Sequence, residues 1–209
     1  LLLRLIDPDS SPRDLPLGRR NAALLRLRDV LFDRRLEGVA NCPSCSETLE
    51  FALDSRALGA YEDRELPASL AVEDPPYALT LRQPTVADAL LAQGDGDLLF
   101  QGLATCATRR GEAVSFDALP ASLRQQAAER LQALDPLLHI ELSFHCPSCD
   151  HQWSAPLDPL SFLWRELEHW AWQTLAAVHR LAAAYGWREQ DILALSAWRR
   201  QIYLEMIGA

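Results

Sequence analysis

The sequence predicts an α+β protein with a small antiparallel β core, a helical insertion and a C-terminal helical unit. Three observations predict this fold class. The tetrapeptide Cys-Pro-Ser-Cys occurs twice, at residues 42–45 and 146–149. Stretches in which apolar and polar residues alternate, the pattern of a half-buried strand, lie beside both copies. A long segment from residue 158 instead repeats its apolar residues with the period of a helix.

The composition is that of a packed globular protein. Of the 209 residues, 49% are hydrophobic and 23% are charged, which is ordinary for a domain with a core. The net charge of −9 disfavours nonspecific binding to nucleic acid. All 20 basic residues are Arg, so neither a P-loop lysine nor a Schiff-base lysine is available. No apolar run is long enough to span a bilayer, and we expect a cytoplasmic protein with no membrane partner.

The first quarter of the chain predicts a helix, a cysteine pair and a strand. The helix is expected over residues 19–38, where Gly38 ends the apolar pattern. Residues 49–53 alternate between apolar and polar or small side chains and predict a strand. The first cysteine pair and its strands thus occupy residues 39–83.

Two further segments complete that region. Residues 62–76 contain five acids and three prolines and are interpreted as an acidic surface loop. Tyr77, Leu79 and Leu81 alternate with other residues and predict a second strand.

Residues 84–136 are predicted to form a helical insert. Its helices are expected over residues 84–92, 98–107 and 122–134, with breaks at a Gly-Asp-Gly turn and before a proline. Cys106 stands alone in an apolar stretch and is interpreted as a buried core thiol.

The last third predicts a second cysteine pair between two strands, followed by helices. Residues 137–157 hold the pair, with a strand over 139–144 and a return strand at Trp153. The C-terminal unit, 158–209, opens with Asp-Pro, a good helix start, and its first helix is expected to stop at Gly186. Two shorter helices are expected, over residues 189–195 and 197–207.

The two tetrapeptides together predict one structural Zn²⁺ ion, which would make the β core zinc-ribbon-like. Each C-x-x-C turn offers two thiolates, and two such turns fill the four positions that zinc prefers. A site with no open position is structural rather than catalytic. The expected ligands are Cys42, Cys45, Cys146 and Cys149. Because the pairs are far apart in sequence, the metal would clasp residues 1–209 into a single domain.

Alternatives to this site remain open from sequence. His145 and His151 flank the second pair, and either could replace a thiolate. Iron also binds four thiolates. A redox-active C-x-x-C usually precedes a helix, and neither pair here precedes a helical pattern. Gly often follows the second Cys of a zinc knuckle, where the backbone φ is positive, but Ser46 and Asp150 take those places here.

No catalytic motif is found, and we expect a protein that is not an enzyme. H-E-x-x-H, a Gly-rich phosphate loop and G-x-S-x-G are all missing from the sequence. Glu166 and His169 have the spacing of a di-iron ligand pair, but a second copy is missing and both fall on the polar side of their helix.

Two features suggest contact surfaces. Phe162 and Trp172 lie off the main apolar stripe of the 158–185 helix, so each either packs on another helix of this chain or binds a partner protein. Six Arg residues between 19 and 35 form either an exposed helix face or a surface for an acidic partner.

Six short segments follow one another along the chain: Leu24-Leu25-Arg26-Leu27-Arg28, Cys42-Pro43-Ser44-Cys45, Arg82-Gln83-Pro84-Thr85, Cys146-Pro147-Ser148-Cys149, Phe162-Leu163-Trp164 and Tyr185-Gly186-Trp187. Their order resembles a known family, the zinc-ribbon proteins encoded in phage-tail-like contractile injection system clusters, which are similar to T4-type baseplate hub assembly proteins. The resemblance begins near residue 17 and covers nearly the whole chain.

The resemblance implies a non-enzymatic assembly factor or minor component of a contractile tail baseplate. Its partners would then be baseplate or hub proteins, and it would associate in the cytoplasm with an assembling particle. The alternatives are a nucleic-acid-binding zinc-ribbon regulator, against which the net charge of −9 counts, and a redox enzyme.

Overall fold

The computed structural model describes residues 11–59 and 66–208, and it has the predicted α+β fold class. The chain divides into two compact units, Leu1–Leu160 and Ser161–Ala209. Both cysteine pairs lie in the first unit. The described elements are α2 (Leu17–Phe32), β1 (Arg35–Asn41), β2 (Thr48–Asp54), a 3-10 turn η1 (Ser55–Leu58), β3 (Ser69–Asp74), β4 (Tyr77–Arg82), α3 (Val86–Ala92), α4 (Gly96–Leu103), β5 (Ala104–Arg109), β6 (Glu112–Ala113), η2 (Phe116–Ala118), α5 (Ala121–Leu134), β7 (Ile140–His145), β8 (Gln152–Leu157), α6 (Pro159–Tyr185), α7 (Glu189–Leu193) and α8 (Ala197–Met206).

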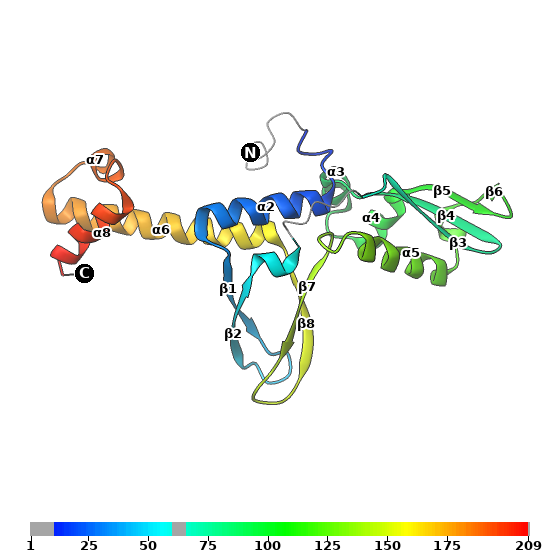
Figure 1. Ribbon diagram of the computed structural model, residues 1–209, viewed down its shortest axis with the longest axis horizontal. Coiled ribbons are helices and arrows are strands. Elements are labelled where there is room, and N and C mark those ends of the chain that lie inside the picture. Colours follow the sequence, from blue (N-terminus) through cyan, green and yellow to red (C-terminus); the bar gives the residue numbers. More distant parts are fainter. Residues whose placement is uncertain (1–10, 60–65, 209) are drawn as a thin grey trace. The chain divides into compact units, whose positions relative to one another are not determined.

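The described strands of the first unit form three separate antiparallel sheets (Figure 1). Strands β1 and β2 make one hairpin, and β7 and β8 make another. Between them in sequence, β3, β4, β5 and β6 form a four-stranded sheet in that order. The cysteine pairs therefore lie on two hairpins. The four-stranded sheet and helices α3 to α5 lie between these hairpins in sequence, over residues 69–134, and are called the insertion from here on.

The insertion has its own hydrophobic core. Val72 of β3 pairs with Leu79 of β4, and both side chains are almost fully buried. Leu123, Ala127 and Leu131 recur every four residues and so line one face of α5, which packs against this sheet. Each of these apolar side chains contributes burial free energy without help from a metal.

An ion pair fastens the end of β4 to the start of α3. Both guanidinium nitrogens of Arg82 lie 2.6 Å from the two carboxylate oxygens of Asp88. Thr85 and Asp88 also form a capping box at the N-terminus of α3. The bonds from Arg82 keep the pKa of Asp88 well below its ordinary value. The sequence Arg82-Gln83-Pro84-Thr85 thus ends a strand and begins a helix.

Three secondary-structure predictions are wrong. The helix predicted over 19–38 ends at Phe32, and Arg35–Asn41 is strand β1. The acidic loop predicted over 62–76 contains β3 from Ser69 to Asp74, although residues 62–65 lie outside the described part of the chain. The helix predicted over 98–107 ends at Leu103 and is followed by β5, so the insert is not all helical.

Cys106 is exposed, so its prediction as a core thiol is also wrong. It pairs with Thr80 in the register of β4 and β5. Since Thr80 lies between the buried Leu79 and Leu81, both residues face away from the core.

The second unit is helical, as predicted. Helix α6 begins at Pro159 and ends at Tyr185, and Gly186 follows with a φ of 66°. Val178, Leu181 and Ile192 form a small buried cluster. Trp187 stacks on Tyr185 with ring centres 4.7 Å apart. Among the described helices, none is both long and apolar enough to cross a membrane.

Candidate metal centre

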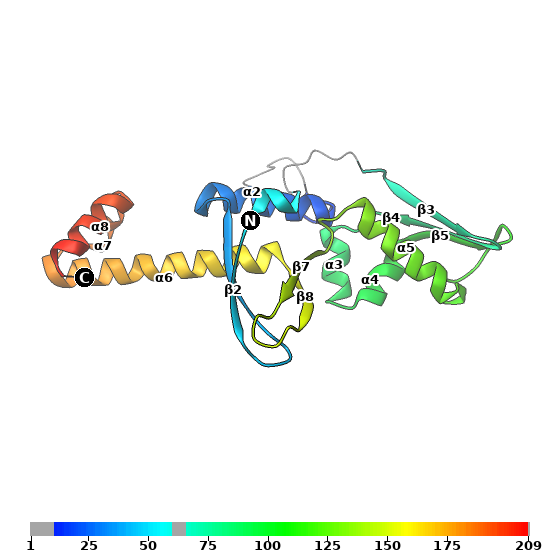
Figure 2. The same cartoon turned by 60° about the horizontal axis from the view of Figure 1, so that its bottom comes forward.

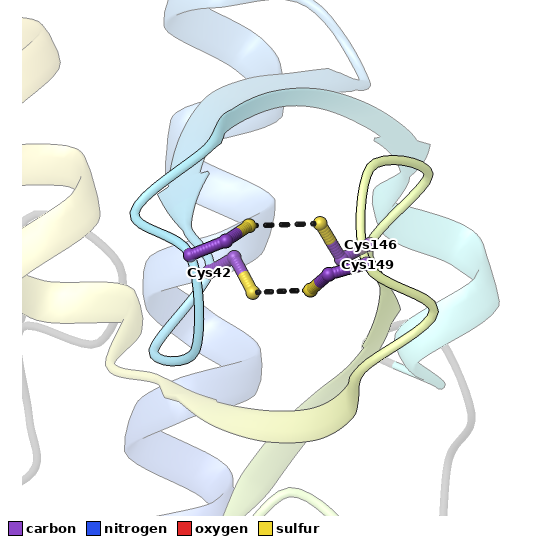
Figure 3. A group of neighbouring side chains, drawn as sticks. Cys42, Cys146 and Cys149 are labelled. Atoms are coloured by element: carbon purple, nitrogen blue, oxygen red, sulfur yellow. Dashed lines mark hydrogen bonds between the residues drawn. The ribbon is translucent and has the colours of Figure 1, made fainter.

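The four cysteines of the two tetrapeptides meet at the tips of the two hairpins (Figure 3). In each hairpin the strand pairing ends just before the first Cys, with Asn41 opposite Thr48 and His145 opposite Gln152. The two tips therefore have loops of the same length, residues 42–47 and 146–151. The fold thus brings the four predicted ligands together, although Cys45 and Cys146 are 101 positions apart in the sequence.

The two loops also share one backbone geometry. The amide of Cys42 donates to the carbonyl of Glu47 at 2.8 Å, and the amide of Cys146 donates to that of His151 at 2.9 Å. Within each loop the residue after the second Cys donates back to the carbonyl of the first Cys, at 2.9 and 3.0 Å. That residue has a positive φ, 62° at Ser46 and 57° at Asp150. Both loops thus adopt the knuckle conformation despite lacking Gly at this place.

The sulfur spacing fits a tetrahedral metal ion. Sγ of Cys42 lies 3.7 Å from Sγ of Cys149, and Sγ of Cys45 lies 3.6 Å from Sγ of Cys146. All four sulfurs lie within 4.8 Å of one another. A tetrahedron with metal–sulfur bonds of about 2.3 Å has sulfur–sulfur edges of about 3.8 Å. The four thiols can therefore hold a metal ion with little movement.

The protonation of the free thiols bears on metal uptake. Burial acts to raise the pKa of Cys42, but hydrogen bonds from the backbone of Cys45 and Ser44 and from neighbouring thiols lower it to about 7. A backbone hydrogen bond at Glu47 acts to lower the pKa of Cys45, but the thiols of Cys149, Cys146 and Cys42, together with burial, raise it to about 12. A metal must therefore displace protons from this cluster at neutral pH.

Neither flanking histidine joins the cluster. Nε2 of His145 lies 3.3 Å from a carboxylate oxygen of Asp150, and the ring of His151 stacks toward Trp153 at 6.1 Å between centres. Among the described residues the candidate ligands are the four cysteines alone. Cys42 and Cys146 are buried, while Cys45 and Cys149 are exposed.

Aromatic rings of the strands also connect the two hairpins. Phe51 of β2 meets Phe144 of β7 edge to face, with ring centres 5.4 Å apart. Phe144 in turn stacks on Trp153 of β8 at 5.3 Å. Gly38, opposite Phe51 in β1, leaves room for this ring, since a Cβ there would lie 2.7 Å from it. The residue that the sequence suggested as a helix stop instead makes room for a contact between the hairpins.

Helix α2 fastens the roots of both hairpins (Figures 1 and 2). At one end, buried Arg28 donates to the carbonyl of Arg35 at 2.7 Å, where β1 begins. Next to it, the hydroxyl of Ser55, just after β2, donates to the carboxylate of Asp29.

The other end of α2 holds the second hairpin. The side-chain amide of Asn21 donates to the backbone carbonyl of Leu137, just before β7, at 2.7 Å. Arg20 reaches Asp158, just after β8, at 3.4 Å. The helix thus spaces the hairpin roots while the cysteines join the tips. The sequence placed Arg20 and Arg28 on an exposed helix face or a partner surface, which is wrong for Arg28, because its side chain is buried and binds the root of β1. The bonds to the second hairpin could not be predicted, since their partners lie up to 138 positions away.

The other predicted residues lie outside this centre. Phe162 is only 7% exposed, so its side chain offers little surface to a partner, whereas Trp172 is 73% exposed. His169 bonds to Gln173 at 2.7 Å, and within the described chain it belongs to no group of three or more candidate metal ligands.

Comparison of the chain with protein-family models, curated proteins and solved structures finds no match.

Proposed function

We propose that Cys42, Cys45, Cys146 and Cys149 hold one structural Zn²⁺ ion. The observation that carries this proposal is the meeting of four thiols, from two hairpins of the same geometry, within 4.8 Å. Zinc is favoured over magnesium or calcium, which prefer oxygen ligands. Four thiolates leave no position for substrate or water, so the ion would stabilise the fold rather than take part in a reaction.

Zinc here would fix the separation of the hairpin tips, as α2 fixes that of their roots. Binding of structural zinc contributes roughly 10–16 kcal/mol in small peptides at neutral pH. This exceeds or matches the stability of a whole domain, about 5–15 kcal/mol. The hairpin pair would therefore depend on its ion.

We further propose that the protein is not an enzyme and acts by binding other proteins, as an assembly factor or minor component of a contractile phage-tail-like baseplate. The sequence resemblance supplies the biological setting. The closed sulfur site supports a structural rather than a chemical role for the centre. Exposed aromatic residues, including Trp172 and Trp198 at 73% each, support binding to proteins.

Metal analysis of protein purified without added metal tests the zinc assignment. We expect one zinc per chain and its loss in Cys45→Ser, with Cys106→Ser, which changes an exposed thiol outside the cluster, as the matched control. Bound iron, no bound metal, or a disulfide that cycles under mild reductant would each overturn the assignment.

Co-purification tests the protein-binding role. The tagged chain is expressed together with the other genes of a contractile-tail cluster, and we expect baseplate or hub proteins to be retained. Cys45→Ser should retain less of them, because its hairpins are no longer clasped. Retention of DNA with a steep salt dependence, or of none of the cluster's proteins, would contradict the proposal.

A further inference from the structure

The part of α6 within the second unit presents an uncovered aromatic face. Trp164, Trp172 and Leu175 are 54%, 73% and 53% exposed. Side chains of this size are normally buried in a monomer, and exposed groups of them mark contact sites. All three lie in residues 161–209, so the face belongs to one unit.

The three side chains share one side of the helix. At about 100° per residue, Leu175 lies about 20° from Trp164 around the helix axis, and Trp172 lies about 80° from it. Glu168 falls between them, about 40° from Trp164. The stripe from 164 to 175 is about 16 Å long, roughly three turns, which is the length over which two helices pack.

Glu168 is exposed, and its carboxylate is hydrogen-bonded to a side chain of this stripe. The indole Nε1 of Trp164 donates a hydrogen bond of 2.7 Å to its carboxylate. The bond satisfies the one polar atom of Trp164 and holds a negative charge in the middle of an apolar surface. Any molecule that covers the tryptophans must also cover that charge.

The charge decides the kind of partner. If a second copy of the chain covered this stripe, two Glu168 carboxylates would approach each other in a poorly solvated interface, which costs free energy. The net charge of −9 adds repulsion between copies. A Lys or Arg opposite Glu168 would instead form an ion pair with an already oriented carboxylate.

We propose that the Trp164 face, made of Trp164, Glu168, Trp172 and Leu175, binds an amphipathic helix of a different protein whose apolar side carries one Lys or Arg opposite Glu168. A helix fits because the four residues recur along α6 at the spacing of helix anchors. Exposed Trp side chains are the residues that dominate binding energy when an interface covers them. The inference rests on the proposed protein-binding role and names the partner's chemistry.

Designed peptides test it on the full, zinc-loaded chain. Three amphipathic helical peptides of about 20 residues differ only at one central position of the apolar stripe, which is Lys, Leu or Glu. We expect the Lys peptide to bind about tenfold more tightly than the Glu peptide, measured by calorimetry. Glu168→Arg should reverse that order, and Glu168→Gln should remove it.

Trp172→Ala tests the aromatic part, with Trp198→Ala as the matched control. Both side chains are 73% exposed, but Trp198 lies on α8. Trp172→Ala should weaken binding of the Lys peptide about tenfold or more, and Trp198→Ala should leave it unchanged. Zinc content and the circular dichroism of both variants should equal those of the parent chain, since neither residue is buried.

Several results would overturn the inference. These are no binding of any peptide, a peptide order that Glu168→Arg leaves unchanged, or equal losses in the two Trp variants. Sedimentation that shows a dimer abolished by Trp172→Ala would identify a second copy as the occupant instead. If Glu168→Arg retains tail proteins in the co-purification experiment as well as the parent chain does, the proposed protein-binding role holds, but the Trp164 face is not the binding site.

Discussion

The insertion and the cysteine hairpins belong to one unit but are stabilised in different ways. The insertion buries a continuous apolar cluster from β3, β4, α4 and α5, in which Leu81 and Leu123 are fully buried. The hairpin strands alternate between exposed and half-buried residues, and beyond the cysteines only Leu36, Ile140 and Leu157 are buried in them. A two-stranded hairpin is marginal in water without further support. We therefore expect the hairpins to depend on a metal at the sulfur site and the insertion to be independent of it.

Metal removal should produce the largest difference between the two regions. After chelation, or in Cys45→Ser, we expect hydrogen exchange of the β1, β2, β7 and β8 amides to rise strongly, because roughly 10–16 kcal/mol of metal binding is lost. Amides of β4 and α5 should remain protected by their apolar core. Exchange measured by mass spectrometry on the same sample reports both regions at once.

The effect should also depend on pH in a set direction. The pKa of Cys45 is raised to about 12 in the free cluster, so protons compete with the metal throughout the neutral range. Metal affinity should fall as pH decreases and the chelator should act faster at pH 6 than at pH 8. Equal loss of protection in α5 and in the hairpins would refute the division into metal-dependent and metal-independent regions.

A core truncation should give the opposite pattern with a smaller effect. Leu123 is fully buried in α5 against the insertion's sheet. Leu123→Ala should destabilise the insertion by about 2–5 kcal/mol through lost burial and a cavity. Zinc content should stay at the parent value, because α2 and the sulfurs hold the hairpins independently. Loss of zinc in Leu123→Ala would show that the two regions fold as one cooperative unit.

The cluster of four cysteines could be predicted from sequence because its signal is local and repeated. Each Cys-Pro-Ser-Cys encodes a complete turn, and two turns encode a complete coordination shell. The lack of Gly at positions 46 and 150 counts against a knuckle in the sequence, yet Ser46 and Asp150 both adopt the positive φ of that turn. The long helix α6 was predictable for the same reason, since its start signal, period and stop lie in one continuous segment.

The errors arose where distant partners decide the structure. Strand β1 begins soon after the end of α2, so the helical pattern runs into it. Its own sequence alternates little between apolar and polar residues. Gly38 in its middle makes room for the ring of Phe51 on the next strand. Strand β5 consists mainly of small residues that could equally continue the preceding helix, and its pairing with β4 makes it a strand. The bonds by which α2 holds the second hairpin join residues 116 and 138 positions apart, so no local pattern contains them.

The smallest predicted effect compares the two knuckles with each other. Ser46 and Asp150 occupy equivalent left-handed positions, and a side chain there costs roughly 1 kcal/mol relative to Gly. Ser46→Gly removes that strain, so we expect zinc to bind up to about fivefold more tightly, measured by competition with a chromophoric chelator at fixed pH. Asp150→Gly should give a smaller gain, because Asp tolerates this conformation better and its carboxylate lies 3.3 Å from His145.

Ser44→Gly is the control for this comparison. It lies in the same loop and is not among the described residues with positive φ, so Gly there adds freedom to the unfolded chain without relieving strain. We expect unchanged or weaker zinc binding in this variant. If Ser46→Gly weakened binding as much as Ser44→Gly does, chain flexibility would outweigh backbone strain in these loops. The two knuckles would then owe their shared shape to the metal rather than to the residues that follow the second cysteine.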